Sequence, residues 1–355
     1  MLAYLRVDVG LLSDFFQEWR KILMDKYKLD IIRYVSLAGY AYDAFLKNTE
    51  TVLDLIHDPE LCKLIQGNIR GGLTTVVKPL HIAKNHRVDS NFDGGQSSYI
   101  TYLDFNSLYP TVMCKPMPLS DIEKMTDTEM KKFLDVGIEN HEVEGEYGYW
   151  IYCDMKPIRP DVARKTDELP LTLTHKIIEH EDLSPYNQDY LFMENRKNPK
   201  KNKKLVASHE EHKLVLHTLK FLQLLLDLGA EVDKVHAVYR YKQTKYLEPF
   251  IQGNVEARKN SISKYKQSAF KCISNSIFGK TLLNPLKRNE KTHIVTTQSN
   301  FLKKVRSPFF KRYIKLKENR AIVISAAEEI LLNHPQQIGF TILEFAKYEL
   351  YYFFL

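Results

Sequence analysis

The sequence is poor in cysteine, and its few cysteines are widely spaced. Its 355 residues contain four cysteines, and none of them belongs to a Cys-x-x-Cys pair. Neither a zinc site of that type nor a disulfide-rich secreted scaffold is indicated, so we expect a reducing, intracellular compartment, nuclear or cytoplasmic. The four are Cys62, Cys114, Cys153 and Cys272.

The sequence also has no long uncharged apolar run near either end. Arg6, Asp8 and Asp14 interrupt the first apolar stretch, so no signal peptide is expected. The stretch "IGFTILEFAKYELYYFFL" is apolar, but Glu344 and Lys347 within it disfavour a membrane-spanning helix. We therefore expect no membrane partner.

Charge and hydrophobicity indicate a folded chain with an anionic partner. With 44% hydrophobic residues the chain can bury one large core or two smaller ones, and its net charge is +7. Basic residues crowd into the stretch "ENRKNPKKNKKLV", whose dense part covers 195–205. This segment is either a solvated loop or a phosphate-contacting or localisation segment.

Apolar periodicity predicts both helices and strands. We expect the helices at 4–27, 53–66, 211–229 and 249–283, and the strands at 99–104, 144–155, 234–243 and 291–297. Within 249–283 an apolar stripe is expected to pack inward, made of Ile262, Tyr265, Ala269, Ile273 and Ile277. Lys264, Lys271 and Asn275 fall on the opposite side of that helix.

A carboxylate stands at the end of the predicted strand 99–104. Asp104 follows "YITYL" and precedes a turn that carries Ser107 and Tyr109. A strand-end Asp can cap a turn or helix, but it can also hold a metal ion beside backbone amides that bind phosphate. Phosphoryl and nucleotidyl transfer need such carboxylates, usually around two divalent ions.

Two strings identify a family resemblance. The string "DFNSLYP" at 104–110 resembles motif A of the family B DNA polymerases, and "KCISNSIFGK" at 271–280 resembles motif B. Likewise, "IRGG" at 69–72 resembles the element that links the exonuclease and polymerase parts, and "YLRVD" at 4–8 resembles the third exonuclease motif. The flanking sequences are similar to the protein-primed branch, found in viruses, linear plasmids and transposons.

The resemblance implies roles for individual residues. Asp104 would bind metal together with the carbonyl of Phe105, and Lys271 would assist catalysis by neutralising the triphosphate. The cofactor would be Mg²⁺ or Mn²⁺, with two ions in the complete enzyme. The nucleotide-binding residues would be Phe105, Ser107, Leu108, Tyr109, Lys259, Lys271, Asn275, Ser276, Phe278 and Gly279.

The linking and exonuclease elements carry further implied roles. Arg70, Gly71 and Gly72 would contact DNA, while Tyr4 and Asp8 would be what is left of an exonuclease site. Two positions depart from the family pattern, because Phe278 and Ile69 each stand where the family has Tyr. The implied partners are template-primer DNA, dNTPs and a terminal priming protein.

The resemblance implies an α+β chain with an incomplete family B polymerase fold, in which a palm sheet carries Asp104 and helical fingers lie near 253–283. Residues 1–60 would be a remnant of the exonuclease domain, and 61–355 a polymerase domain with an insertion at about 120–235. Residues after about 284 would return toward the palm.

One expected string is missing. Family B polymerases carry a second metal-binding Asp in motif C, Asp-Thr-Asp, and the 355 residues contain no such string. We therefore expect a fragment that lacks motif C and the thumb and is inactive or nearly so on its own.

Two other readings remain open. The chain could be a non-catalytic remnant of a viral or transposon polymerase that still binds DNA or dNTPs, with an affinity that falls steeply with salt. A different metal enzyme is the other alternative. His209 and His212 are three apart on a predicted helix, but the spacing is not His-Glu-x-x-His.

Overall fold

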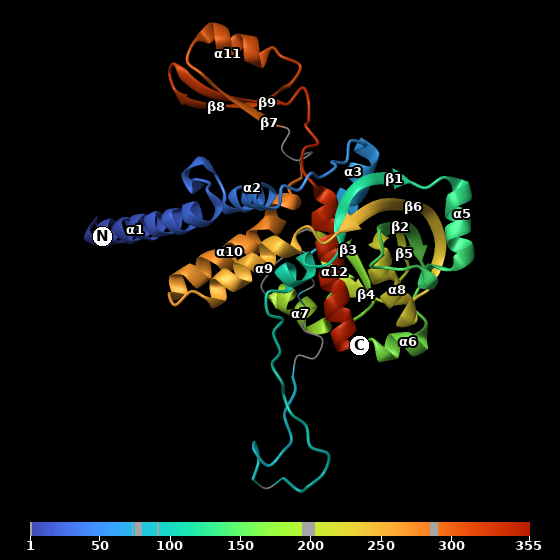
Figure 1. The fold of residues 1–355 in the computed structure, drawn as a ribbon. Helices are drawn as coiled ribbons and strands as arrows, with labels where there is room; N and C mark the ends of the chain where they lie inside the picture. Colours follow the sequence, from blue (N-terminus) through green and yellow to red (C-terminus); the bar gives the residue numbers. More distant parts are fainter. Residues whose placement is uncertain (1, 73, 75–79, 91, 194–202, 285–289) are drawn as a thin grey trace.

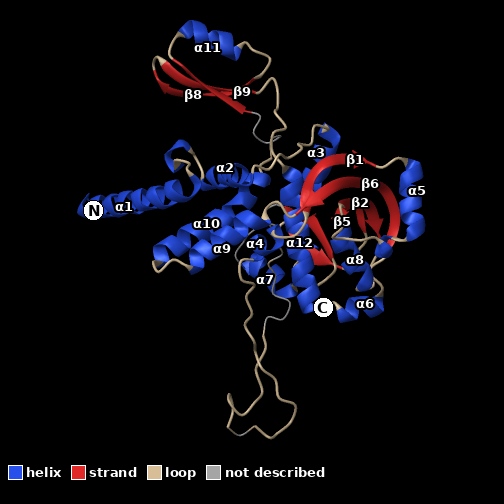
Figure 2. Cartoon of the chain, viewed as in Figure 1, coloured by secondary structure: helices blue, strands red, loops and turns tan. Residues whose placement is uncertain are grey.

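The computed structural model describes residues 2–72, 74, 80–90, 92–193, 203–284 and 290–355. It is a mixed structure of helices and antiparallel sheets, as expected for an α+β chain (Figures 1 and 2). The basic segment predicted at 195–205 falls almost entirely outside the described residues, and so does most of the segment after Gly72.

A bundle of helices forms one half of the main body. Its members are α1 (Leu2–Tyr27), α2 (Leu37–Thr49), α4 (Leu108–Met113), α9 (Glu248–Lys259), α10 (Lys264–Thr281) and α12 (Gln336–Phe354), with the short η1 (Ile31–Arg33) between the first two. Their shared core includes Leu23, Phe45, Met113, Ile273 and Ile342, all with no exposed surface. We call this the helical core.

A curled sheet forms the other half of the main body. Its strands run in the order β1 (Met117–Lys124), β6 (Val232–Thr244), β2 (Tyr147–Met155) and β5 (His212–Thr218), and every pair is antiparallel. The sheet wraps around helix α8 (Leu219–Asp227), with α5 (Asp127–Val136) and α6 (Pro160–Lys165) at its margins (Figure 1). The segment expected as an insertion, 120–235, thus supplies most of this sheet.

Smaller elements complete the main body. These are α3 (Pro59–Asn68), η2 (Ile138–Asn140), the antiparallel pair β3 (Thr172–Ile177) and β4 (Lys203–Ser208), η3 (His180–Asp182) and α7 (Pro185–Met193).

A second sheet stands clear of the main body. It has three strands, in the order β7 (Glu290–Val295), β9 (Arg320–Ala326) and β8 (Phe310–Lys317), and helix α11 (Gln298–Val305) packs on it. Figure 1 shows this unit, in orange, apart from the other elements. The strand predicted at 291–297 is confirmed, but residues after 284 do not return to the main sheet at this point.

Helix α12 joins the two halves of the main body. Ile338 and Ile342 belong to the helical core, whereas Phe340 packs on Trp150 of the sheet and Tyr351 on Phe221 of α8. Because both sides of α12 are covered by protein, even its polar residues between Gln336 and Lys347 are buried.

Several predicted elements are confirmed, and one changes type. The strands predicted at 144–155 and 234–243 are β2 and β6, and the helix predicted at 249–283 is the pair α9 and α10. The helix predicted over 211–229 is wrong in its first part, because 212–218 is strand β5, hydrogen-bonded to β2. Gly229 does end the helix that follows, with φ of +98°.

The strand predicted at 99–104 is also wrong in this structure. These residues lie in a long loop that projects from the main body, and Tyr102 is 92% exposed (Figure 1). A strand needs backbone partners, and no described strand pairs with this stretch. The two arms of the loop meet near its middle, where Ser98 N donates to Lys84 O at 2.7 Å.

None of the described helices is both long enough and apolar enough to cross a membrane.

Gly148 in strand β2 is required by its neighbours. A Cβ built there would lie 2.3 Å from the ring of Tyr241 and 2.6 Å from Gln243 Oε1. We predict that Gly148→Ala lowers the free energy of unfolding by about 1–3 kcal/mol, because the buried ring must move. Urea unfolding followed by circular dichroism measures this change.

Gly253→Ala in helix α9 is the matched control. A Cβ at Gly253 would meet no atom within 4 Å. This substitution should leave stability unchanged or raise it by about 0.5–1 kcal/mol, because alanine favours helix. Equal destabilisation by both variants would contradict the packing described for β2.

Candidate active site

The turn after Asp104 has a strained backbone. Ser107 adopts a left-handed conformation, with φ of +52° and ψ of +52°, and helix α4 begins at the next residue. Its carbonyl accepts hydrogen bonds from Thr111 N and Thr111 Oγ1, at 3.0 and 3.1 Å. A non-glycine residue held at positive φ is uncommon and is often found at functional sites.

Helix α10 is held in place by its inner face. Ala269, Ile273 and Ile277 have no exposed surface, and the helix packs against α2, α9 and α12. The predicted stripe is therefore confirmed at these three positions, whereas Ile262 precedes the helix and is exposed. On the outer face Lys271 and Asn275 are exposed, so both can reach a ligand.

The turn and the outer face of α10 meet around one small cavity. Ser107 and Pro110 line it from the turn and α4, and Lys271 and Asn275 from α10; its volume is about 30 Å³. Beside it the rings of Tyr109 and Phe278 stack, with centroids 4.4 Å apart and planes 13° from parallel. Residues of the two sequence motifs, far apart in the chain, are thus brought together.

Other predicted nucleotide-binding residues are close in sequence to the residues that line the cavity but do not line it themselves. Leu108 packs against the helical core, and Ser276 Oγ donates to Cys272 O at 2.6 Å within the helix. Gly279 is exposed, and a Cβ there would make an ordinary contact with Ala38 at 3.6 Å. Lys259 is exposed at the end of α9.

Helix α9 contributes a cation that sequence reasoning missed. Arg258, and not its neighbour Lys259, lines the cavity together with Lys271. The phase of α9 decides between the two, because buried Phe250, Ile251 and Asn254 fix which face points to α10. The string "EARKN" alone gives no such preference.

Asn254 supports the cavity from behind. Its Oδ1 accepts from Tyr27 of α1 at 2.6 Å, and its Nδ2 donates to Ser274 Oγ of α10 at 3.2 Å. All three side chains are buried, so these hydrogen bonds fix α1, α9 and α10 relative to one another.

Of the two implied metal ligands, Asp104 is open to solvent and Phe105 is half-buried. Asp104 is exposed and makes no ion pair with another described residue, so its carboxylate is available to a cation. The ring of Phe105 packs edge-on against Phe353 of α12, with centroids 5.3 Å apart. The described residues contain no group of three or more His, Cys, Asp or Glu side chains that could hold a metal ion.

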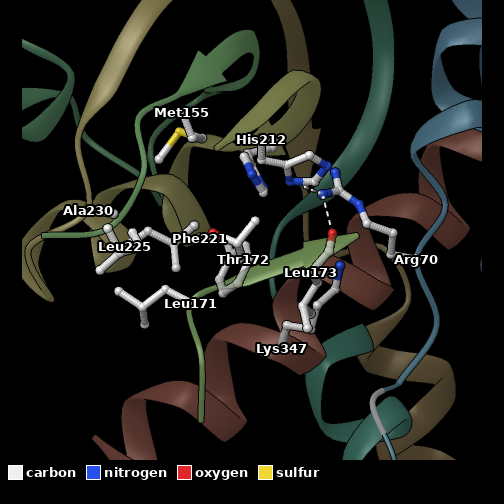
Figure 3. A pocket seen from close by; sticks show the side chains of 12 residues that line it. Arg70, Met155, Leu171, Thr172, Leu173, His212, Phe221, Leu225, Ala230 and Lys347 are labelled. Atoms are coloured by element: carbon white, nitrogen blue, oxygen red, sulfur yellow. Dashed lines mark hydrogen bonds between the residues drawn. The ribbon is translucent and has the colours of Figure 1, made fainter. Parts of the chain in front are cut away.

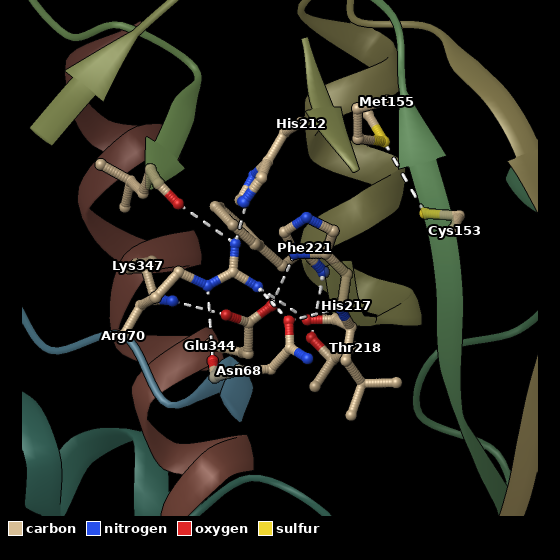
Figure 4. Close-up of polar contacts among 12 residues, drawn as sticks. Asn68, Arg70, Cys153, Met155, His212, His217, Thr218, Phe221, Glu344 and Lys347 are labelled. Atoms are coloured by element: carbon tan, nitrogen blue, oxygen red, sulfur yellow. Dashed lines mark hydrogen bonds and ion pairs between the residues drawn. The ribbon is translucent and has the colours of Figure 1, made fainter. Parts of the chain in front are cut away.

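Arg70 is in the interior and not on a DNA-facing surface. Only 4% of its surface is exposed, and the guanidinium donates to the carbonyls of Leu173 and Leu216, each at 3.2 Å, and to Asn68 Oδ1 at 3.1 Å (Figure 4). Its guanidinium therefore ties together α3, β3 and β5. Gly71 is exposed, with no atom within 4 Å of an added Cβ.

The last of the implied DNA and exonuclease positions are on the surface. Gly72 is exposed next to Gly71, and Tyr4 and Asp8 are exposed on the first turns of α1.

A buried ionic group surrounds Arg70. Glu344 of α12 accepts from Lys347 Nζ and lies 2.9 Å from His217 Nδ1, and all three are more than nine-tenths buried (Figure 4). Burial alone would raise the pKa of Glu344, but Lys347, His217 and Arg70 lower it below its ordinary value. Glu344 is therefore an anion inside the protein.

A small cavity adjoins this ionic group. Its volume is about 10 Å³, which is room for about one water molecule. Figure 3 shows Arg70, Lys347 and His212 on one side of it and apolar residues such as Leu171 and Leu225 on the other.

The two histidines considered for zinc do not form a site. His212 is in strand β5, where Arg70 Nη1 lies 3.5 Å from its Nδ1, and His209 Nε2 lies 2.9 Å from Thr166 Oγ1. They are not on a common helix, which removes the reason for pairing them.

Comparison with known proteins identifies the family. A family model described as DNA polymerase type B, organellar and viral, matches residues 1–349. The chain therefore belongs to the organellar and viral type B DNA polymerases, and the resemblance read from the motif strings is confirmed. No curated protein matches the chain.

Solved structures of phi29 DNA polymerase are among the similar folds. An orthorhombic crystal form matches with a TM-score of 0.49 and 15% identity, covering 92% of this chain and 46% of that one. The complex with primer-template DNA gives 0.47 and 16%, with 93% and 46% covered. The ternary complex with primer-template DNA and incoming nucleotides gives 0.46 and 17%, with 90% and 45% covered. The chain thus spans less than half the length of these proteins.

We predict that removing the Asn254 side chain destabilises the helices around the cavity. Asn254→Ala removes the acceptor of the buried Tyr27 hydroxyl and leaves Ser274 Oγ with its bond to Phe270 O, so the free energy of unfolding should fall by about 1–3 kcal/mol. Tyr27→Phe removes one of the two hydrogen bonds and should cost less. Thermal unfolding of the two variants checks this order, and a larger loss for Tyr27→Phe would contradict it.

His212 predicts a pH dependence of stability. Burial, and then the charge of Arg70, lower the pKa of His212 from 6.5 to about 3. Between these values the unfolded chain binds a proton that the folded chain does not, so the free energy of unfolding should fall as the pH drops below about 6.5.

The variant His212→Gln tests this titration. Glutamine keeps an oxygen that can accept from Arg70 but does not titrate, so stability should fall less steeply between pH 6.5 and 4. Urea unfolding across this range measures both slopes. Identical slopes would mean that His212 does not titrate in this way.

Proposed function

We propose that this chain supplies the nucleotide-binding part of a DNA-directed DNA polymerase, which adds dNMPs from dNTPs to a primer. One observation supports this most: the turn after Asp104 and the outer face of α10 meet around a single cavity, with Lys271 and Arg258 at its edge. Two cations beside a turn of free backbone amides suit a triphosphate.

Each part of the arrangement has a task in this proposal. Lys271 and Arg258 attract the triphosphate and neutralise the charge that develops on the leaving pyrophosphate. Amides near Ser107 and Leu108 bind phosphate oxygens, and Tyr109, stacked on Phe278, lies beneath the sugar. Asn275, Ser276 and Gly279 border the base pair that is being formed.

Divalent metal ions belong to the complete enzyme in this proposal. Asp104, through its carboxylate, and Phe105, through its carbonyl, would hold an ion, and two Mg²⁺ or Mn²⁺ ions supply charge neutralisation and activation of the primer hydroxyl. The carboxylate of Asp104 is exposed and forms no ion pair with any described residue, which fits this use.

The same proposal implies the binding partners of the chain and its division into two domains. We propose template-primer DNA and a terminal priming protein as partners, with Gly71 and Gly72 near the template strand. Arg70 instead holds this segment in place from inside the protein. Residues 1–60 correspond to the end of an exonuclease domain, with Tyr4 and Asp8 its remaining site residues, and 61–355 to the polymerase domain.

The second candidate function is binding without synthesis. The 355 residues contain no Asp-Thr-Asp string, and transfer with two metal ions needs a second carboxylate. We propose that these residues alone bind dNTPs and DNA but do not extend a primer.

Lys271→Ala tests the nucleotide site. Removing this ammonium should weaken binding of a fluorescent dNTP analogue about tenfold, the effect of about 1.4 kcal/mol. Lys266→Ala is the control, because Lys266 is exposed on the same helix but does not line the cavity. An equal loss in both variants would show general attraction by positive charge and reject the site.

A primer-extension assay separates the two candidate functions. With Mg²⁺ or Mn²⁺ the 355-residue chain should incorporate no dNMP above background while still binding the dNTP analogue. If extension is seen and Asp104→Asn abolishes it, these residues suffice for catalysis and the binding-only candidate is rejected.

A further inference from the structure

The last turn of helix α1 contacts the two helices that carry the cations of the candidate nucleotide cavity. Lys26 Nζ donates to the carbonyl of Gly253 in α9 at 2.7 Å and lies 4.8 Å from the ring centroid of Phe270 in α10. Tyr27, the next residue, donates to Asn254 Oδ1 in α9 at 2.6 Å. Two neighbouring side chains of α1 therefore hold both α9 and α10.

These contacts continue to the wall of the cavity. Asn254 and Phe270, which α1 contacts directly, both line it, and so does Ser274. Ser274 Oγ accepts from Asn254 Nδ2 at 3.2 Å and donates to Phe270 O at 3.1 Å. All three residues are buried, so water does not compete for these hydrogen bonds.

The two cations lie within one helical turn of these buried residues. Arg258 follows Asn254 by four residues in α9, and residues four apart share a helix face. Lys271 directly follows Phe270 in α10. A shift of either helix against α1 would therefore change the distance between the two cations.

Holding the two cations together needs support from behind. Arg258 and Lys271 line the same cavity of about 30 Å³, and their repulsion favours a wider separation of α9 and α10. Lys26 is half-buried against these helices, and burial lowers its pKa while the charge of Glu256 opposes this. A cation partly removed from water binds an aromatic face more strongly than an exposed one.

We propose that Lys26 and Tyr27 are positioning residues of the nucleotide site. By holding α9 and α10 from behind, they fix the separation of the two cations and with it the affinity for the triphosphate of a dNTP. Neither side chain lines the cavity, so both act through the residues that do. This inference rests on the proposed function, because it concerns the same site.

Binding of the fluorescent dNTP analogue by the 355-residue chain tests the proposal. Tyr27→Phe and Lys26→Met should each weaken binding about threefold, because part of the contribution of one hydrogen bond reaches the ligand. Lys26→Arg keeps the charge and a donor and should restore the affinity. Since Tyr27→Phe changes no charge, its effect cannot come from lost attraction.

A double variant separates positioning from a general loss of stability. In a Lys271→Ala chain, Lys26→Met should cause a smaller further loss of affinity than in the unchanged chain, because one of the positioned cations is already absent. Urea unfolding of every variant establishes that it is folded under the binding conditions. Fully additive losses would overturn the proposal.

Two control variants come from the same part of the chain. Tyr40→Phe removes a hydroxyl from a buried ring that packs on Tyr27 but does not line the cavity, and Lys21→Met removes an exposed cation of α1 that pairs with Glu18. Both should leave the affinity unchanged. An equal loss in either control, or no loss in Tyr27→Phe, would overturn the positioning role while the nucleotide site stands. No binding of the analogue by the unchanged chain would reject the nucleotide site and this role together.

Discussion

Helix α12 can lie inside the protein only because charges on it are compensated there. Glu344 and Lys347 form an ion pair next to His217, and Arg70 lies close enough to lower the pKa of Glu344 further. Taking one member of such a group away leaves a buried charge and costs about 3–5 kcal/mol. The same group joins α12 to β5 and, through Arg70, to α3 and β3, so the two halves of the main body depend on it.

The geometry of the candidate nucleotide site depends on the position of α12. Helix α12 packs on both α4 and α10, and these two elements carry the residues of motif A and motif B. The stacking of Tyr109 on Phe278 therefore depends on the position of α12 behind α4 and α10. Arg258, Lys271 and Asn275 at the cavity are exposed, whereas the layer beneath them is closely packed, which suits a site that must admit a charged ligand.

Motif strings and helical periodicity predicted much of the helical structure and of the candidate site. They failed where pairing or packing between distant segments determines the structure. The stripe Ala269, Ile273 and Ile277 followed from spacing alone, because one helix face packs locally against its neighbours. Residues 212–218 read as helix, yet pairing with β2 makes them a strand. Residues 99–104 have strand-like composition but no described partner, and composition cannot supply one. Arg258 was missed because only the packing of α9 separates it from Lys259.

The position of α12 in the chain also constrains how the protein is made. Its residues, 336–354, are synthesised after every strand of the curled sheet and after the helices α1 to α10. Its side chains nevertheless pack both in the helical core and in the apolar cluster between the curled sheet and α8. Until the ribosome has released this helix, apolar surface on both halves must stay uncovered, a state prone to aggregation. Folding of the main body thus requires α12, and its many contacts between residues distant in sequence favour a low folding rate.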